Sequence, residues 1–245
     1  MRRSLSPFHA FATFTGLLLA LLAPCGARLA GPAHAADLGQ LGRRVWQTEN
    51  GLPQNTVHSV IQDFEGYVWV ATEEGIARFD GAGFVVFDKQ NTPGLRSNDV
   101  RSLLATKKGN VLWASTAGGL ARRRAGVWET LTTEQGLAGN DVVAACEARD
   151  GAVWVATSSG LSRLREGVWT SFTTRDGLAD DNVQAVAEDF SDETGGVWVG
   201  TAEGLSRFRE GKFTNFTTAD GLPGGVSAIE RDREGGLWLG TSAGL

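Results

Sequence analysis

Carboxylate and amide side chains recur in short polar segments along this 245-residue chain. Such groups can hydrogen-bond the hydroxyls of a carbohydrate or another neutral polyol, and carboxylates can also bind a cation. On this basis the candidate ligand-binding residues are Glu73, Glu74, Asn98, Asp99, Asn140, Asp141, Asp180, Asp181 and Glu203. The alternative is that they are solvated turn residues without a ligand, because loops at a protein surface are commonly polar.

Residue types that act as nucleophiles, acid–base groups or metal ligands are scarce. After removal of an N-terminal leader, the chain keeps one histidine, His58, and one cysteine, Cys146. A lone histidine has no obvious base partner, and Cys146 falls in an apolar strand pattern where we expect a small buried side chain. We therefore expect no catalytic residue, no metal site and no cofactor.

The leader carries the features of a secretory signal peptide. Arg2 and Arg3 precede an apolar run over residues 11–23, which is too short to span a bilayer, and Ala33-His34-Ala35 fits a cleavage site. We expect residues 1–35 to be removed; an uncleaved anchor is the alternative. Their loss leaves 20 basic and 28 acidic residues, a net charge of −8. That charge disfavours nucleic acid as a partner.

The rest of the chain is repetitive. A Gly-Leu pair recurs at steps of 43, 42, 41 and 44 residues, and a tryptophan recurs in phase with it. A threonine follows each tryptophan by three residues and a glycine by six. The repeated residues are Trp69, Trp113, Trp154, Trp198 and Trp238; Thr72, Thr116, Thr157, Thr201 and Thr241; Gly75, Gly119, Gly160, Gly204 and Gly244.

Each repeat predicts four short strands separated by turns. In the first repeat they are Val57–Ile61, Val68–Thr72, a strand from Ile76, and Phe84–Phe87. Four strands in about 42 residues, with no helical periodicity, are typical of a β-propeller blade. The predicted fold class is therefore all-β, a β-propeller of four-stranded blades, with four full blades and partial ones from a seven-bladed type of ring.

The repeated side chains have predicted structural roles. The tryptophans should fill the space between neighbouring blades, the threonines should bond an adjacent turn, and the glycines should permit a positive φ. An arginine also recurs, and it could pack and pair within the blade or line a groove for an anion. These arginines are Arg78, Arg122, Arg163 and Arg207.

The repeat also sets the expected boundaries. We expect a lead-in over residues 36–50 with a lone outer strand at Val45–Thr48, and an incomplete fifth blade over residues 221–245. The four full blades are expected at residues 51–93, 94–135, 136–176 and 177–220. Because the fifth blade is incomplete, we expect the chain to be the N-terminal part of a longer polypeptide.

The frame of the repeat, seen most fully from Val57 to Arg78, resembles the two-component regulator propeller repeat, and the resemblance extends over roughly residues 41–245. Two turns depart from it: Thr106-Lys107-Lys108-Gly109 lacks the aspartate, and the turn after Asp189 has extra residues. The resemblance implies a periplasmic sensor region of a membrane-bound histidine kinase, hybrid two-component regulator or diguanylate cyclase. Further blades, a stalk domain, a membrane-spanning helix and a kinase or cyclase would then follow.

The resulting hypothesis is a ligand-binding sensor propeller in signal transduction by phosphorelay. Its partners would be an unknown small-molecule or carbohydrate ligand and the remaining blades and output domain of the longer chain, with membrane contact only through that later sequence. The location would be periplasmic, with the parent protein anchored in the inner membrane. Two alternatives stay open: an exported propeller enzyme of the lyase or glycosidase type, and a protein-binding scaffold.

Overall fold

The computed structural model describes residues 44–106, 108–190 and 196–245, so the expected signal peptide lies outside the described residues. The compact unit Val45–Leu245 is built of short antiparallel strands. The first sheet comprises β1 (Val57–Gln62), β2 (Val68–Thr72), β3 (Gly75–Phe79) and β4 (Phe84–Phe87). The second comprises β5 (Val100–Thr106), β6 (Val111–Thr116), β7 (Gly119–Arg124) and β8 (Val127–Leu131).

The same arrangement continues to the end of the chain. The third sheet comprises β9 (Val142–Glu147), β10 (Val153–Thr157), β11 (Gly160–Arg165) and β12 (Val168–Phe172). The fourth comprises β13 (Val183–Asp189), β14 (Gly196–Thr201), β15 (Gly204–Arg209) and β16 (Lys212–Phe216), and β17 (Val226–Arg231) with β18 (Leu237–Thr241) forms a two-stranded sheet. Strands pair in chain order within every sheet. The predicted all-β fold of four-stranded propeller blades is confirmed.

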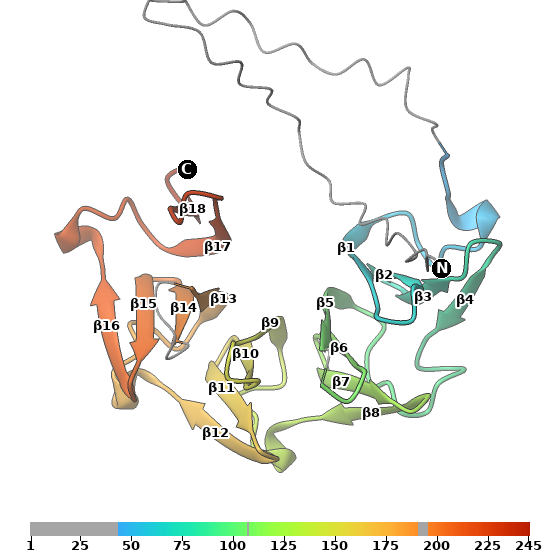
Figure 1. Ribbon diagram of the computed structural model, residues 1–245, viewed down its shortest axis with the longest axis horizontal. Coiled ribbons are helices and arrows are strands. Elements are labelled where there is room, and N and C mark those ends of the chain that lie inside the picture. The colour runs from blue at the N-terminus through green and yellow to red at the C-terminus, as the bar shows by residue number, and fades with distance from the viewer. Residues whose placement is uncertain (1–43, 107, 191–195) are drawn as a thin grey trace, which may run out of the picture. The chain divides into compact units, whose positions relative to one another are not determined.

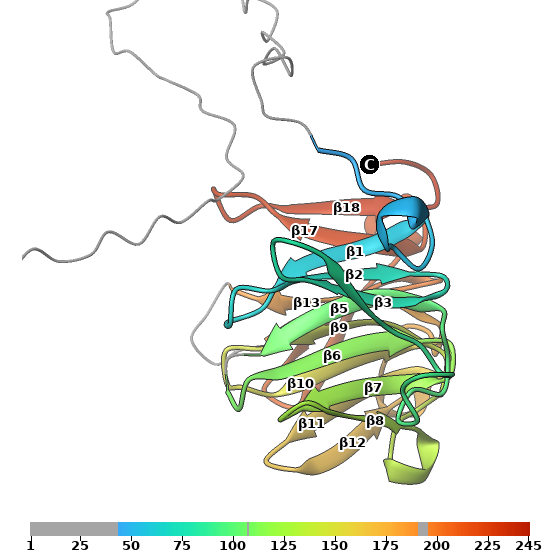
Figure 2. The ribbon, with the colours of Figure 1, turned by 90° about the vertical axis from the view of Figure 1, so that its right-hand side faces the viewer.

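The first strand of each sheet is the innermost one. Strands β1, β5, β9, β13 and β17 contact one another in succession, whereas β4, β8, β12 and β16 form the outer edges of their sheets (Figure 1). Each sheet therefore faces its neighbour, and Figure 2 shows the successive sheets from the side. The inner strands are thus the elements that bring residues from different blades together.

Indole side chains fill the junctions between sheets. Trp69 packs against Leu95 and Val100 of the second repeat, and Trp154 packs against Val183 and Phe208 of the fourth. Trp69 and Trp154 expose 0% and 2% of their surface, whereas Trp238 of the two-stranded sheet exposes 54%. A tryptophan therefore contributes most where the next four-stranded sheet covers it, because burial of aromatic surface is the favourable term.

The Gly-Leu pair closes the connection into each new blade. A single turn of 3-10 helix, for example Thr133–Gln135, ends at Gly136, whose φ is +108°. A Cβ at Gly136 would lie 2.9 Å from Cβ of Trp169, so both the backbone angle and the space favour glycine. The next residue, Leu137, is buried between the second and third sheets.

The repeated threonine and glycine fix the hairpin between the second and third strands. In the third sheet Thr157 Oγ1 donates to the Gly160 carbonyl over 2.7 Å and accepts from the Ser159 N–H at 3.2 Å. The equivalent donation to the glycine carbonyl is made by Thr72, Thr116, Thr201 and Thr241. The glycines have φ between +123° and +151°. This clamp sets where each hairpin ends.

A carboxylate organises the turn between the first and second strands. Asp63 accepts the N–H groups of Glu65 and Tyr67 and the indole N–H of Trp69, the last at 2.6 Å. In the second repeat Thr106 Oγ1 accepts the indole N–H of Trp113 at 3.3 Å. The third repeat also departs from the frame, and the sequence analysis did not note this. Buried Ala148 occupies the position of the aspartate, six residues after Val142, and Asp150 follows two residues later.

The prediction of a strand at Val45–Thr48 is wrong. Residues 45–47 are not in a strand, and Thr48–Asn50 forms a turn of 3-10 helix. No described strand pairs with this segment, and an extended segment without a partner gains no ladder hydrogen bonds. Instead, the Trp46 ring packs edge-on against Phe79 at 5.3 Å between centroids.

The junctions predict unequal costs for equivalent tryptophan truncations. Trp154→Ala should lower the free energy of unfolding by about 3–5 kcal/mol, because it empties a fully covered junction. Trp238→Ala should cost less than about 1 kcal/mol, because that side chain is half exposed. Urea unfolding followed by circular dichroism measures both; equal losses would contradict the assigned role of the junctions.

Candidate functional site

One end of the blades carries two kinds of connection, and we call it the loop face. Because strands alternate in direction, the links from each blade to the next and the hairpins between second and third strands lie at the same end. The links are residues 88–99, 132–141, 173–182 and 217–225, and the hairpins are residues 73–74, 117–118, 158–159 and 202–203. All the predicted ligand-binding residues lie on these segments.

Each inner strand has a β-bulge near the loop face. In β1 the register slips between Val57 and Ser59, so His58 has no partner on β2. The equivalent slip in the other four inner strands leaves one residue out of the ladder. The five bulge residues are His58, Arg101, Val143, Gln184 and Ser227. A bulge redirects the strand locally and frees that side chain from pairing.

Arg101 brings two of the predicted residues together across a blade junction. Its Nη1 lies 2.7 Å from Oδ1 of Asp141 in the next blade, and its Nε lies 3.6 Å from Oδ2 of Asp99. The side chain of Arg101 is 33% exposed, and the side chains of Asp99 and Asp141 are each 42% exposed. The cluster offers both hydrogen-bond donors and acceptors to a polar ligand while keeping opposite charges adjacent.

Three other predicted residues, Glu73, Glu74 and Asn98, make contacts on the loop face of the first two repeats. Glu74 Oε2 accepts from Nδ2 of Asn98 at 3.5 Å, which links the first hairpin to the following loop. Glu73 Oε1 lies 3.8 Å from Nε2 of His58. The structure therefore gathers charged and amide side chains from the first three blades near the inner strands.

The remaining predicted residues serve their own loops or stand apart. Asn140 and Asp181 accept backbone N–H groups from Thr133 and Thr174 at 2.8 and 2.6 Å, and Asn98 does the same for Lys89 at 2.9 Å. Asp180 accepts the N–H of Asn182 at 2.8 Å, and Glu203 is exposed. Loop ordering alone accounts for the contacts of Asn140, Asp180 and Asp181.

Arg101 was missed by the sequence analysis. The signal that could have found it is the residue after the repeated valine, which differs in every repeat although the frame around it is constant. The repeated arginines, by contrast, stack on the tryptophans of their own blades. The guanidinium-to-ring distances are 5.8 Å for Arg78, 5.6 Å for Arg122, 5.4 Å for Arg163 and 4.9 Å for Arg207.

Neither a metal centre nor a membrane span is found in the described part of the chain. Among residues 44–106, 108–190 and 196–245, no three His, Cys, Asp or Glu side chains are grouped so that they could hold a metal ion. In the same residues no helix has the length and apolar character needed to cross a bilayer.

The blades, their inner-strand bulges and the loop face define a β-propeller. Three segments of the chain, residues 51–74, 136–159 and 220–243, match the family model described as two component regulator propeller. These three segments are therefore two-component regulator propeller repeats. No curated protein matches it in a sequence comparison.

Solved structures share the fold. The extracellular domain of a putative hybrid two-component system from B. thetaiotaomicron is 24% identical, with a TM-score of 0.71 over 81% of this chain and 29% of that one. The extracellular domain of a putative one-component system from the same organism is 19% identical, with a TM-score of 0.62 over 76% and 28% of the two chains. This chain thus spans less than a third of either protein.

An enzyme has the same architecture. Virginiamycin B lyase from Staphylococcus aureus is 17% identical, with a TM-score of 0.56 over 77% of this chain and 68% of the lyase. At these identities all three likenesses concern the fold, so the function must be argued from the site.

Cys146 lies on β9 and packs with the core around Trp154. Burial, and to a smaller extent the carboxylate of Glu188, raise the pKa of the Cys146 thiol well above its usual range. The thiol is therefore held in its protonated, unreactive form at neutral pH.

This predicts slow alkylation of the folded protein. In a Cys25→Ser background at pH 8, iodoacetamide should modify Cys146 at least about tenfold more slowly than in urea, where the pKa returns to about 8.5. Mass spectrometry of timed samples measures the rate. Equal rates before and after unfolding would show an accessible thiolate.

Proposed function

We propose that this chain is the ligand-binding sensor propeller of a two-component-type signal transduction protein, with its ligand bound on the loop face. The observation that carries the proposal is the Arg101 cluster, in which Asp99 and Asp141 from adjacent blades meet one guanidinium at 3.6 and 2.7 Å. Such a cluster joins two blades, so a ligand that competes for these groups would act on the junction between them.

The chemistry of the cluster favours a neutral polyhydroxylated ligand such as a carbohydrate. Carboxylates accept and a guanidinium donates several hydrogen bonds, while the net charge of Asp99, Arg101 and Asp141 together is −1, which attracts no strong anion. His58 on β1 and Gln184 on β13 add further polar groups at the same end of the inner strands.

The proposed location is extracytoplasmic, in the periplasm. Two observations support it: the leader with its expected cleavage site at residues 33–35, and the fold shared with extracellular domains of a hybrid two-component and a one-component system. The bound state would be passed to a kinase or cyclase output domain in a longer polypeptide anchored in the inner membrane.

An exported enzyme is the second candidate, since a lyase has this fold and His58 lies near Glu73. A histidine beside a carboxylate can act as a general base. If the site were catalytic, His58→Ala would abolish turnover of a bound ligand while leaving its binding intact. A sensor would bind the ligand and release it unchanged, which chromatography of the ligand after incubation shows directly.

Ligand binding can be tested by thermal unfolding with a panel of mono- and disaccharides. A binding sugar should raise the unfolding temperature of the full chain, and Arg101→Gln should abolish that rise by leaving both carboxylates without their cation. Arg124→Gln, on the opposite face, is the matched control and should keep the rise. An unchanged rise in Arg101→Gln, or no rise with any sugar, would refute the proposed site.

The relay to an output domain has a separate test. The reading frame of the gene should remain open beyond the codon for Leu245 and encode further blades, a hydrophobic span and a kinase or cyclase. A stop codon directly after Leu245 would remove the proposed output while leaving the ligand-binding test unaffected.

A further inference from the structure

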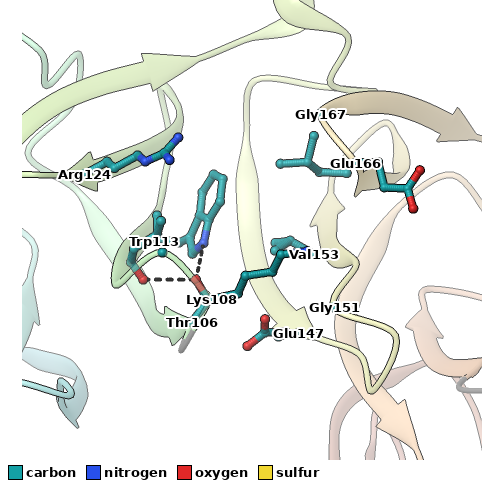
Figure 3. A pocket seen from close by; sticks show the side chains of 12 residues that line it. Thr106, Lys108, Trp113, Arg124, Glu147, Gly151, Val153, Glu166 and Gly167 are labelled. Carbon is teal, nitrogen blue, oxygen red and sulfur yellow. Dashed lines mark hydrogen bonds between the residues drawn. The ribbon is translucent and has the colours of Figure 1, made fainter.

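A pocket of about 250 Å³ opens between the second and third sheets at the end opposite the loop face (Figure 3). Its walls come from the turns between first and second strands and between third and fourth strands. Trp113, Val153 and Leu164 provide apolar surface, and the charged lining residues are Lys108, Arg124, Glu147 and Glu166. The loop-face cluster contributes none of these residues.

The pocket exists because a large side chain is replaced at one repeat position. This position lies on the third strand of each sheet, opposite the residue that precedes the repeated tryptophan. It holds Arg123 in the second sheet, Leu164 in the third and Phe208 in the fourth. The Arg123 guanidinium covers Trp69 at 5.3 Å, and the Phe208 ring covers Trp154 at 4.9 Å. Over Trp113 the residue is the shorter Leu164, so space remains.

A second replacement removes a bridge between the turns. At the first junction Asn110 Nδ2 donates to Glu65 Oε1 over 2.7 Å and ties the turns of the first two sheets together. At the next junction Ala152 stands in the place of Asn110, and Lys108 stands in the place of Glu65. Alanine has no polar group, so this bridge cannot form and the entrance stays open.

The two walls carry opposite charges. Lys108 and Arg124 belong to the second repeat, and Glu147 and Glu166 belong to the third. In Figure 3 Arg124 and Glu166 lie on opposite sides of the apolar surface formed by Trp113 and Val153. Among the described residues, Arg124 and Glu166 form no ion pair with each other or with a third group. A ligand with two opposite charges would pair with Arg124 on one wall and with Glu166 on the other.

We propose that this pocket binds a small zwitterion, an aliphatic α-amino acid. Its carboxylate would bind Arg124 and Lys108, its ammonium group would bind Glu166, and its side chain would lie on Trp113. The volume is below the range of about 300–1,000 Å³ typical of drug-sized ligands, which suits a molecule of this size. The inference is independent of the loop-face sensor site.

The test is equilibrium dialysis of the full chain with radiolabelled L-leucine. The competitors are N-acetyl-leucine, which lacks the ammonium group, and leucinamide, which lacks the carboxylate. Each should bind at least about tenfold more weakly than leucine, because each loses one charge-assisted contact. No leucine binding up to about 10 mM, or equal competition by all three compounds, would overturn the proposal; a ligand this small need not bind tightly.

Variants locate the binding. Arg124→Gln and Glu166→Gln should each weaken leucine binding about tenfold, and Leu164→Phe, which restores the packing seen over Trp154, should abolish it. Glu210→Gln, at the position equivalent to Glu166 in the fourth sheet, is the matched control and should bind normally. Thermal unfolding confirms that each variant is folded. Unchanged binding in folded Leu164→Phe would place leucine elsewhere and refute the site.

Discussion

Burial of one indole ring at each junction is the interaction on which the rest of this fold depends. A four-stranded sheet of this kind is apolar on both faces, and it becomes stable only when another sheet covers those faces. Trp69, Trp113 and Trp154 expose between 0% and 3% of their surface because the following sheet covers them. The turn carboxylate of Asp63 and the clamp of Thr72 on Gly75 hold the strand that carries Trp69 at both ends.

The positions of the strands could be predicted because they follow from local patterns. The tryptophan, threonine and glycine of each repeat mark one strand and its hairpin, and β2, β6, β10, β14 and β18 all end at the repeated threonine. The segment at Val45–Thr48 fits the same local pattern and still forms no strand, because pairing requires a neighbour that a local pattern cannot supply. Ala148 was likewise overlooked because a nearby Asp150 resembles the expected turn residue.

The functional site was less accessible to sequence reasoning. Polar loop residues have the same composition whether they order a loop or face a ligand, so Asn140 and Asp181 could not be distinguished from Asp99 and Asp141. What separates them is Arg101, whose guanidinium reaches across a blade junction to Asp141, 40 residues later in the sequence. The pocket beside Trp113 was hidden for a similar reason, since only a comparison of equivalent positions in three dimensions shows that Leu164 is too short.

The β-bulge of each inner strand has a consequence for how such a protein can change. The residue at the bulge has no partner in the ladder, so its identity is uncoupled from the backbone hydrogen bonds that hold the strands of a blade together. In this chain the five bulges already carry five different residue types on one nearly constant frame. Single substitutions there can alter recognition at little cost to folding, so diversification of binding and preservation of architecture can proceed independently.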